Sequence, residues 1–347
     1  MHGESDTVRK CESEGRSSFD YGIGIRTDIV RNKLWFKEES QERWSGPELL
    51  ENLASIYEQL YLTPGEAGEK LYPDIVLRGQ HAPTRSLDHF HGTKKDNCVD
   101  RSTPAGKVRV LTLYDRSDFE TFLQIMAEAC RKTAIPATQG AVILDGVINH
   151  RRIEQHKEAF YRAAQEAGMP EPSWFQWEME KARFMQDKAN YTDALIVLSV
   201  GPYSAVPARR AGFEESEWLT LSHTIREYHE CTHFVCRRLW PDKKDAIWDE
   251  IVADAVGLLA ALGKYDMRLA KLALGIEDGR YVGGRLENYV PEQIADKTKY
   301  IEGILRKVLA VMEAAQRFSE NMADDPFALA FTLEERKDSL WDGTADN

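Results

Sequence analysis

Two histidines and a glutamate within five residues carry the clearest chemical signal in the chain. The run Tyr228-His229-Glu230-Cys231-Thr232-His233 contains the pattern H-E-x-x-H. An α-helix advances about 100° per residue, so His229 and His233 project from one face, roughly 40° apart and one turn along the helix. Two imidazoles placed in this way can bind one Zn²⁺ together. Glu230 lies too far round the helix to be a natural third ligand, yet close enough to reach a water beside the metal.

Such a motif is informative only on a helix, and its flanks predict one. Apolar and small residues recur at the spacing of a helix with one buried face. They are Leu221, Ile225, Tyr228, Thr232, Val235 and Leu239. Pro241 should end this helix.

A second helix should follow, from about Asp245 to Leu262, with Gly263 as its stop signal. Glu250 and Asp254 are four residues apart on it, so their carboxylates share one face. Gly257 on the same helix would allow a neighbouring helix to approach closely.

H-E-x-x-H followed by a helical E-x-x-x-D resembles the gluzincin group of zinc metallopeptidases, over about residues 220–265. The resemblance implies that His229, His233 and Glu250 bind one Zn²⁺ and that Glu230 is the general base. It also implies that Asp254 orients His229. Glu250 follows His233 by 17 positions, and Asp249 stands where some members of the group have asparagine.

Three protein ligands leave one position on zinc for water, as in a catalytic rather than a structural site. The expected activity is therefore hydrolysis of a peptide or amide bond, in which a metal-activated water attacks and Glu230 transfers its proton. The substrate would be a peptide or protein. A donor to the developing oxyanion is also needed. The candidates are Arg226 and Tyr281, and more distantly His223, Tyr265 and Arg285.

Two alternatives remain open from the sequence. A non-catalytic, zinc-stabilised binding or regulatory protein could keep the same residues without turnover. A carboxylate-bridged di-iron protein would need a second E-x-x-H, which the sequence lacks. Cys236, one turn past His233, is either a fourth ligand or, more in keeping with its residue type, a small buried hydrophobe.

The predicted fold class is α+β and predominantly helical, with a zincin-like core, a small mixed sheet, a metal-binding helix and a following glutamate helix. Four regions are expected. They are a disordered leader (1–20), an N-terminal mixed region with a polar loop (21–106), a zincin-like metallohydrolase core (107–320) and a C-terminal short helix and tail (321–347).

Individual elements follow from periodicity and turn residues. Helices are predicted at 47–60, 117–132, 151–167, 173–190 and 289–318, and strands at 108–114 and 192–200. A capping box of Ser117 and Glu120 should open the second of these helices. Residues 78–106 are expected to be a long loop, with Asp88-His89-Phe90-His91 on its surface. The Pro-containing segment 201–207 should lie at the rim of the cleft and accept an extended substrate by strand addition.

Composition excludes several functions. The formal net charge is −12, which argues against a general nucleic-acid binder, because phosphate contacts require clustered Lys and Arg. No stretch approaches 18 consecutive apolar residues, so no membrane span is expected. The N-terminus lacks the apolar region of a secretory signal. The five cysteines are scattered, which favours a reducing cytoplasm over a disulfide framework.

Overall fold

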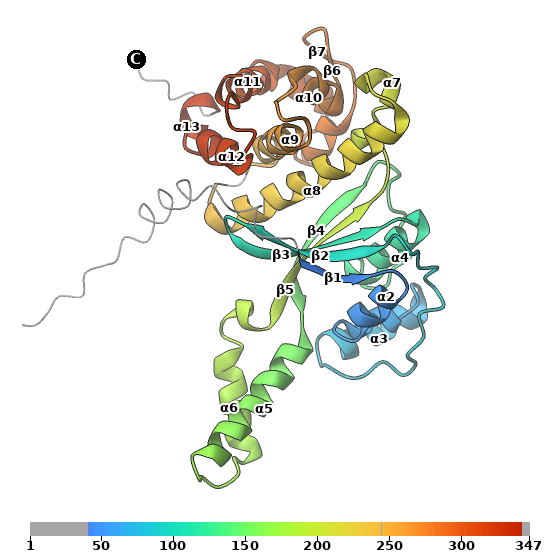
Figure 1. Ribbon diagram of the computed structural model, residues 1–347, viewed down its shortest axis with the longest axis vertical. Coiled ribbons are helices and arrows are strands. Elements are labelled where there is room, and N and C mark those ends of the chain that lie inside the picture. Colours follow the sequence, from blue (N-terminus) through green and yellow to red (C-terminus); the bar gives the residue numbers. More distant parts are fainter. Residues whose placement is uncertain (1–40, 244, 342–347) are drawn as a thin grey trace, which may run out of the picture. The chain divides into compact units, whose positions relative to one another are not determined.

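The computed structural model describes residues 41–243 and 245–341. The leader expected at 1–20, the first part of the 21–106 region and the end of the tail lie outside these residues. The described chain has an α+β fold in which helices enclose a small mixed sheet (Figure 1). The elements before the metal-motif helix are β1 (Gln41–Ser45), α2 (Glu48–Ala54), η1 (Glu58–Tyr61), α3 (Glu66–Val76), β2 (Asn97–Thr103), β3 (Gly106–Leu113), α4 (Arg116–Met126), β4 (Ala141–Ile148), α5 (His150–Glu166), α6 (Trp174–Phe184), η2 (Lys188–Asn190), β5 (Thr192–Ser199), η3 (Tyr203–Ala205) and α7 (Ala208–Ala211).

Helices dominate the rest of the chain. The elements are α8 (Glu215–Leu239), α9 (Ala246–Leu262), α10 (Met267–Leu274), β6 (Ile276–Glu277), β7 (Arg280–Tyr281), η4 (Arg285–Tyr289), α11 (Lys297–Phe318), α12 (Phe327–Glu334) and α13 (Lys337–Leu340). No helix in the described part of the chain combines the length and apolar content needed to cross a membrane.

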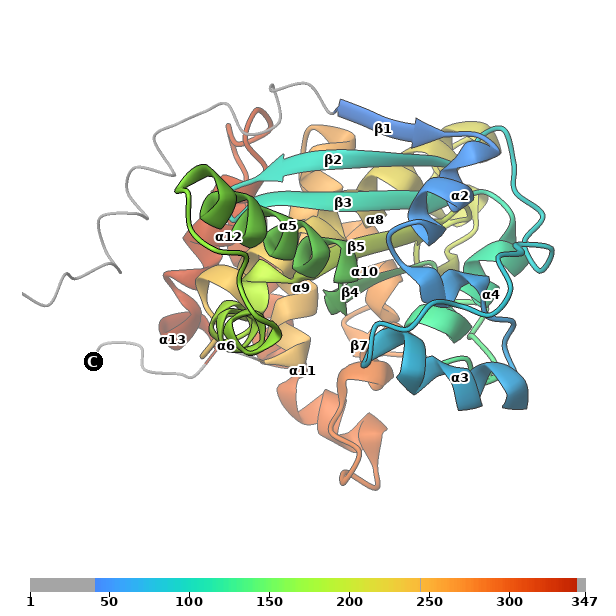
Figure 2. The same cartoon turned by 90° about the horizontal axis from the view of Figure 1, so that it is seen from below.

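The larger sheet has the strand order β1-β2-β3-β5-β4 (Figure 2). Only β3 and β5 run parallel, and the other neighbouring pairs are antiparallel. Strands β3 and β5 were both expected. The central position of β5 follows from its near-continuous apolar run, since a central strand is covered on both faces. Strand β3 alternates and pairs beside it.

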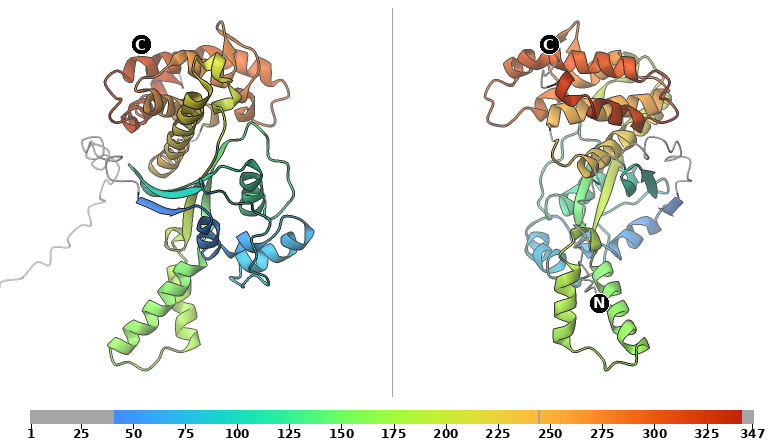
Figure 3. Two further views of the ribbon diagram at one scale, coloured as in Figure 1. Left: turned by 45° about the vertical axis from the view of Figure 1, so that its right-hand side comes forward. Right: turned by 90° about the vertical axis from the view of Figure 1, so that its left-hand side faces the viewer.

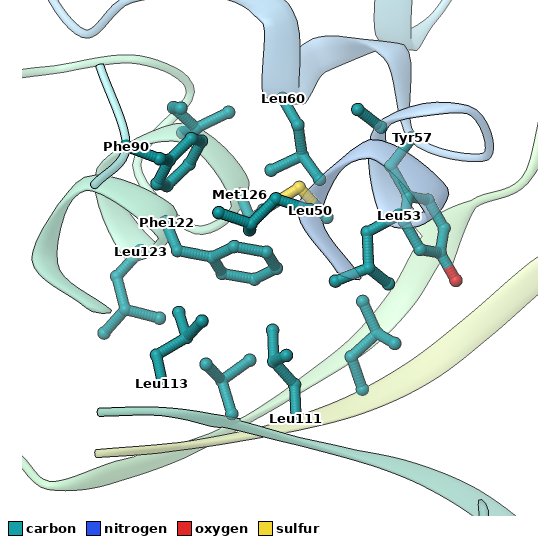
Figure 4. Close-up of a cluster of buried hydrophobic side chains, with 14 of the residues drawn as sticks. Leu50, Leu53, Tyr57, Leu60, Phe90, Leu111, Leu113, Phe122, Leu123 and Met126 are labelled. Carbon is teal, nitrogen blue, oxygen red and sulfur yellow. The ribbon is translucent and has the colours of Figure 1, made fainter. Parts of the chain in front are cut away.

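Each face of the sheet carries its own layer of helices. Leu111 and Leu113 of β3, with Leu195 and Val197 of β5, pack in one apolar cluster with α2, η1 and α4 (Figure 4). Side chains alternate along a strand, so Thr112 points to the opposite face. There its hydroxyl lies 3.1 Å from Nε2 of His223 on α8. The helix with the H-E-x-x-H motif therefore lies across the face away from this cluster.

The predicted loop at 78–106 was wrong in its last part, because β2 occupies 97–103. Only Cys98 and Thr103 of this strand are buried, so it shows no apolar alternation. Backbone pairing with β1 on one side and β3 on the other makes it a strand. The sheet therefore continues across the boundary that was expected at residue 106.

Three predicted helices have different limits. The helix expected at 47–60 is split into α2 and η1, because the chain leaves the helical conformation at Tyr57, whose ring is buried. The helix expected from Ser117 is capped by Asp115 instead, whose side chain accepts from the backbone N–H groups of Ser117 and Asp118. Similarly, Asp296 caps α11, so that helix begins at Lys297 and the residues from 285 to 289 form η4.

Helices α5 and α6 form a hairpin that extends from the ends of β4 and β5 (Figure 3). The helix expected at 173–190 is shorter and ends at Phe184, followed by η2. Trp177 is buried in the hairpin, whereas Trp174 is 74% exposed. Trp174 is exposed because two helices packed only along one stripe leave the first turn of α6 uncovered.

Candidate metal centre

The centre begins with the two histidines of α8. This 25-residue helix brings His229 and His233 to one buried face, one turn apart. Their rings lie edge to face with centroids 4.7 Å apart, and their Nε2 atoms are 3.0 Å apart. Two ring nitrogens facing each other at this distance, in a buried position, are well placed to share one cation.

Helix α9 brings the third donor. Asp245 caps its first turn, and Gly263 ends it in the left-handed region as predicted. Gly257 permits the close packing of α8 and α9, because a Cβ at this position would lie 2.6 Å from the carbonyl oxygen of Ile225. The Glu250 carboxylate thereby reaches both imidazoles, with Oε2 3.3 Å from Nε2 of His229 and Oε1 3.1 Å from Nε2 of His233.

The three side chains fit a zinc site. Zinc–ligand distances of about 2.0–2.1 Å in a tetrahedron place two ligand atoms about 3.3–3.4 Å apart. The observed separations are 3.0, 3.1 and 3.3 Å. Two imidazoles, which bind metals in their neutral form, and one carboxylate are also the ligands that bind zinc in hydrolytic sites. One carboxylate oxygen, Oε2 of Glu250, is buried without a hydrogen bond in the described structure, as expected of an atom reserved for a cation.

Asp254 lies directly behind His229. Its Oδ1 is 2.9 Å from Nδ1 of His229, and its side chain is almost fully buried. Burial disfavours the charged carboxylate, but Arg285 and His229 outweigh this effect and hold the pKa of Asp254 below its usual value. Asp254 is therefore placed to fix the orientation of His229, so that Nε2 faces the other two donors.

Two further residues complete this support, and they come from distant segments. Arg285 donates to both oxygens of Asp254 and, through Nη1, to the Tyr203 hydroxyl at 3.0 Å. Tyr203 in turn donates to Asp254. Burial raises the pKa of Tyr203 well above its usual value, so the hydroxyl keeps its proton. Sequence reasoning placed Arg285 among the possible oxyanion donors and missed Tyr203 as a site residue.

The charges of the centre are strongly coupled. Burial disfavours protonated His229, but the carboxylates of Glu250 and Asp254 outweigh it and raise the pKa of His229 to about 10. The two histidines likewise hold the pKa of Glu250 well below its usual value, against the effect of burial. The buried carboxylates thus require a nearby positive charge, which a proton or a metal cation can provide.

Glu230 lies on the same helix turn as the histidines and is also buried. Within the described residues its carboxylate makes no hydrogen bond and no ion pair, in contrast to Glu250 and Asp254. A carboxylate that is buried but uncommitted can accept a proton from a bound water, as a general base must.

The two residues assigned as oxyanion donors are committed elsewhere. Arg226 donates to the carbonyl oxygens of Gly201 (2.6 Å) and Pro202 (2.8 Å), and burial lowers its pKa to about 10. The Tyr281 hydroxyl donates to the carbonyl of Gly284 at 2.9 Å and accepts from its N–H. Arg226 therefore secures the chain after β5, and Tyr281 secures a glycine turn. Neither assignment agrees with the observed contacts.

Tyr289 was not predicted to be a site residue, yet it lies at the metal centre. Its phenol lies beside the carboxylates of Glu250 and Asp254, and the Arg285 guanidinium is 6.0 Å from its ring centroid. Burial, together with the nearby carboxylates of Glu250 and Asp254, raises the pKa of Tyr289 above its usual value despite the opposing charge of Arg285. A phenol that stays protonated beside the third donor is a better candidate for an oxyanion donor than Arg226 or Tyr281. The residues around Tyr289 do not indicate a functional role, because the sequence predicted that Tyr289 begins a long helix.

The rim segment 201–207 does not act as an open strand edge. Its carbonyls accept from Arg226, and the N–H of Tyr203 donates to the Ser222 hydroxyl at 2.9 Å. The segment was expected to bind an extended substrate, and its backbone groups are instead engaged with α8.

Other candidate ligands are used differently. The Cys236 thiol is buried, and among the described residues the possible ligand group on α8 and α9 consists of His229, His233 and Glu250. The loop at His91 lies beside Asp115 and Asp118, a second group of possible ligands among the described residues. Asp118, however, accepts from the backbone of His91 and Gly92, and Asp115 caps α4. These carboxylates therefore hold the loop against a helix.

Comparison with known proteins gives a family but no activity. Residues 67–330 match a family of unknown function, DUF7005, and the chain belongs to this family. The matched region includes every residue of the metal centre described above. No curated protein and no solved structure matches the chain.

Proposed function

We propose that this protein is a zinc-dependent hydrolase that cleaves a peptide or amide bond. The observation that carries the proposal is the set of three donor atoms on α8 and α9, separated by 3.0–3.3 Å, with an uncommitted carboxylate on the next residue of the helix. A helix with H-E-x-x-H lying across a small mixed sheet, followed by the helix with the glutamate, also supports a zincin-like architecture.

His229, His233 and Glu250 would hold the metal. Zinc bound there would supply a lowered water pKa and a polarised substrate carbonyl. Glu230 accepts the proton of the attacking water as the oxygen bonds to the carbonyl carbon. When the C–N bond breaks, Glu230 returns that proton to the leaving nitrogen and ends the cycle as it began.

Tyr289 would act as the donor to the carbonyl oxygen as negative charge develops on it. Its raised pKa keeps the proton on the hydroxyl at neutral pH, and its position next to Glu250 places it beside the reacting atoms. We expect Tyr289→Phe to lower kcat by about 10²-fold and to leave zinc content unchanged. Equal loss in Tyr281→Phe, whose hydroxyl bonds to Gly284, would contradict this assignment.

The free edge of β4 is the better place for an extended substrate. Within the described chain β4 pairs only with β5, so its other edge offers unpaired backbone groups. Gly140, just before this strand, lies against the Arg226 side chain, one turn before Glu230. A peptide that adds to this edge would therefore run alongside the centre, and cleavage of extended peptides is expected rather than of small amides.

The decisive experiment is Glu230→Gln. The variant keeps the shape of the side chain and removes the basic oxygen, so we expect full zinc content and at least about 10²-fold slower hydrolysis. His229→Ala should lose the metal as well. Activity is first sought by cleavage of a peptide library with and without a chelator. A Gln variant with full zinc and full function would favour the alternative, a zinc-stabilised binding or regulatory protein.

Metal analysis of the purified protein tests the remaining alternative. One zinc per chain is expected, whereas a di-iron protein would bind two iron atoms through bridging carboxylates. The expected cytoplasmic location agrees with the free thiols of the four described cysteines and stays a prediction.

A further inference from the structure

The two histidines of the centre are supported unequally. Nδ1 of His229 faces Asp254 at 2.9 Å. Nδ1 of His233 has no hydrogen-bond partner among the described residues, although Nε2 of the same ring faces Glu250. A histidine that binds a metal normally donates its other ring N–H to a carboxylate, a carbonyl or a water, because this fixes the tautomer and the ring orientation.

A small pocket lies beside His233. Its volume of about 10 Å³ is that of a site for one water, and its lining includes the carboxylates of Asp249 and Glu334. A buried water is retained where it has two to four polar partners. The ring of His233 and these two carboxylates supply that number.

Glu334 is the least expected member of this lining. It ends α12, is only 1% exposed, and lies outside the residues that match the family. Its Oε1 accepts from Nε1 of Trp248 at 2.6 Å, but its Oε2 is buried without a hydrogen bond in the described structure. A buried carboxylate oxygen without a donor keeps the full cost of its lost hydration, so a donor in the pocket would stabilise it.

Helix α12 is firmly attached at this position. The rings of Trp240 and Phe331 meet edge to face with centroids 5.0 Å apart, and Tyr228 stacks on Phe327. Lys243 also donates to the carbonyl oxygen of Glu334 at 3.2 Å. Helix α12 thus holds the Glu334 side chain against the helix that carries His233.

We propose that Glu334 is a positioning residue of the metal centre and acts on His233 through one water in this pocket. The water accepts the Nδ1–H of His233 and donates its two hydrogens to Oε2 of Glu334 and to the carboxylate of Asp249. This arrangement satisfies each of the three groups. It gives His233 the support that Asp254 gives His229. The inference rests on the proposed zinc site.

The test measures zinc affinity rather than turnover. Glu334→Gln retains an acceptor for Trp248 and replaces the charged oxygen in the pocket. We expect its zinc dissociation constant to rise about 10–100-fold, and the urea midpoint of the metal-free protein to stay unchanged. The absorption spectrum of the cobalt-substituted variant should also change, since the His233 ring is less firmly oriented. Glu335→Gln, the same charge change at the exposed neighbour, should behave as the parent protein.

Asp249→Asn provides the second variant. It should weaken zinc binding to a similar extent, and the double variant should lose less than the sum of the two effects, because both carboxylates act through one water. An unchanged zinc affinity in Glu334→Gln, or a loss matched by destabilisation of the metal-free protein, would overturn the inference. Since the readout needs no substrate, inactivity of the protein toward peptides would refute the proposed hydrolysis and leave this result standing.

Discussion

The contact between α8 and α9 at Gly257 should control both stability and zinc binding. In Gly257→Ala the new Cβ would lie 2.6 Å from the carbonyl oxygen of Ile225, and ordinary contacts begin at 3.4 Å. Because the obstacle is backbone rather than a flexible side chain, the helices must separate by about 0.8 Å, the difference between these two distances.

Two opposing effects decide the sign of the stability change. Alanine is favoured over glycine inside a helix by about 1 kcal/mol. Overpacking of a close interface costs typically about 1–3 kcal/mol. We therefore expect a net loss of up to about 2 kcal/mol in the free energy of unfolding, measured by urea titration of the metal-free protein.

The effect on zinc should be larger, because the ligand set spans the same interface. Glu250 lies 3.1–3.3 Å from the two imidazoles across it, and metal sites tolerate only about 0.2 Å of change in ligand distance. We expect the zinc dissociation constant, measured by competition with a chelating dye, to rise at least about tenfold.

Gly303→Ala is the matched control. This glycine is also helical, on α11, and a Cβ there would meet nothing within 4 Å. It should gain up to about 1 kcal/mol of stability and bind zinc as the parent protein does. If Gly257→Ala gave the same result as this control, the reasoning that links the helix contact to the metal centre would be refuted.

Three further predictions concern charged groups and thiols. Asp254→Ala should lower the free energy of unfolding by about 3–5 kcal/mol, because it leaves the Arg285 guanidinium buried without its partner, and it should also weaken zinc binding. In urea titration, Asp254→Asn should lose less stability than Asp254→Ala. A hydrogen bond from Arg183 lowers the pKa of Glu180 to about 2. The contribution of Glu180 to stability is therefore present above about pH 4.5 and is lost as the pH falls toward 2. In Glu180→Gln the free energy of unfolding should depend less on pH over this window. Burial raises thiol pKa values, so the native protein should resist alkylation at pH 8 and react fully in urea, as mass spectrometry can show for Cys130, Cys231 and Cys236.

Much of the centre could be predicted because its parts are local in sequence. The i, i+4 spacing of His229 and His233 depends only on the helix, and so does the shared face of Glu250 and Asp254. The role of Gly257 was also predicted, since a glycine inside an apolar helix indicates a close neighbour. The α+β class with a small mixed sheet is likewise confirmed.

Local pattern failed where long-range pairing decides the conformation. Strand β2 is polar, and it is a strand because β1 and β3 hydrogen-bond to it. Arg226 looked like a catalytic cation because it lies one turn before His229. Its guanidinium is instead satisfied by carbonyls about 25 residues earlier in the chain, which no periodicity reveals.

The sequence by itself determined the donor types and the two helices that present them, because helical spacing is set by nearest turns of one chain. Only the tertiary structure decided which distant groups support these donors. Tyr203 and Arg285 meet at Asp254 from segments 82 positions apart, and Glu334 reaches the pocket beside His233 from α12. Such contacts depend on how the helices pack over the sheet. Packing is a property of the whole core, so a single stretch of sequence carries no signal for it.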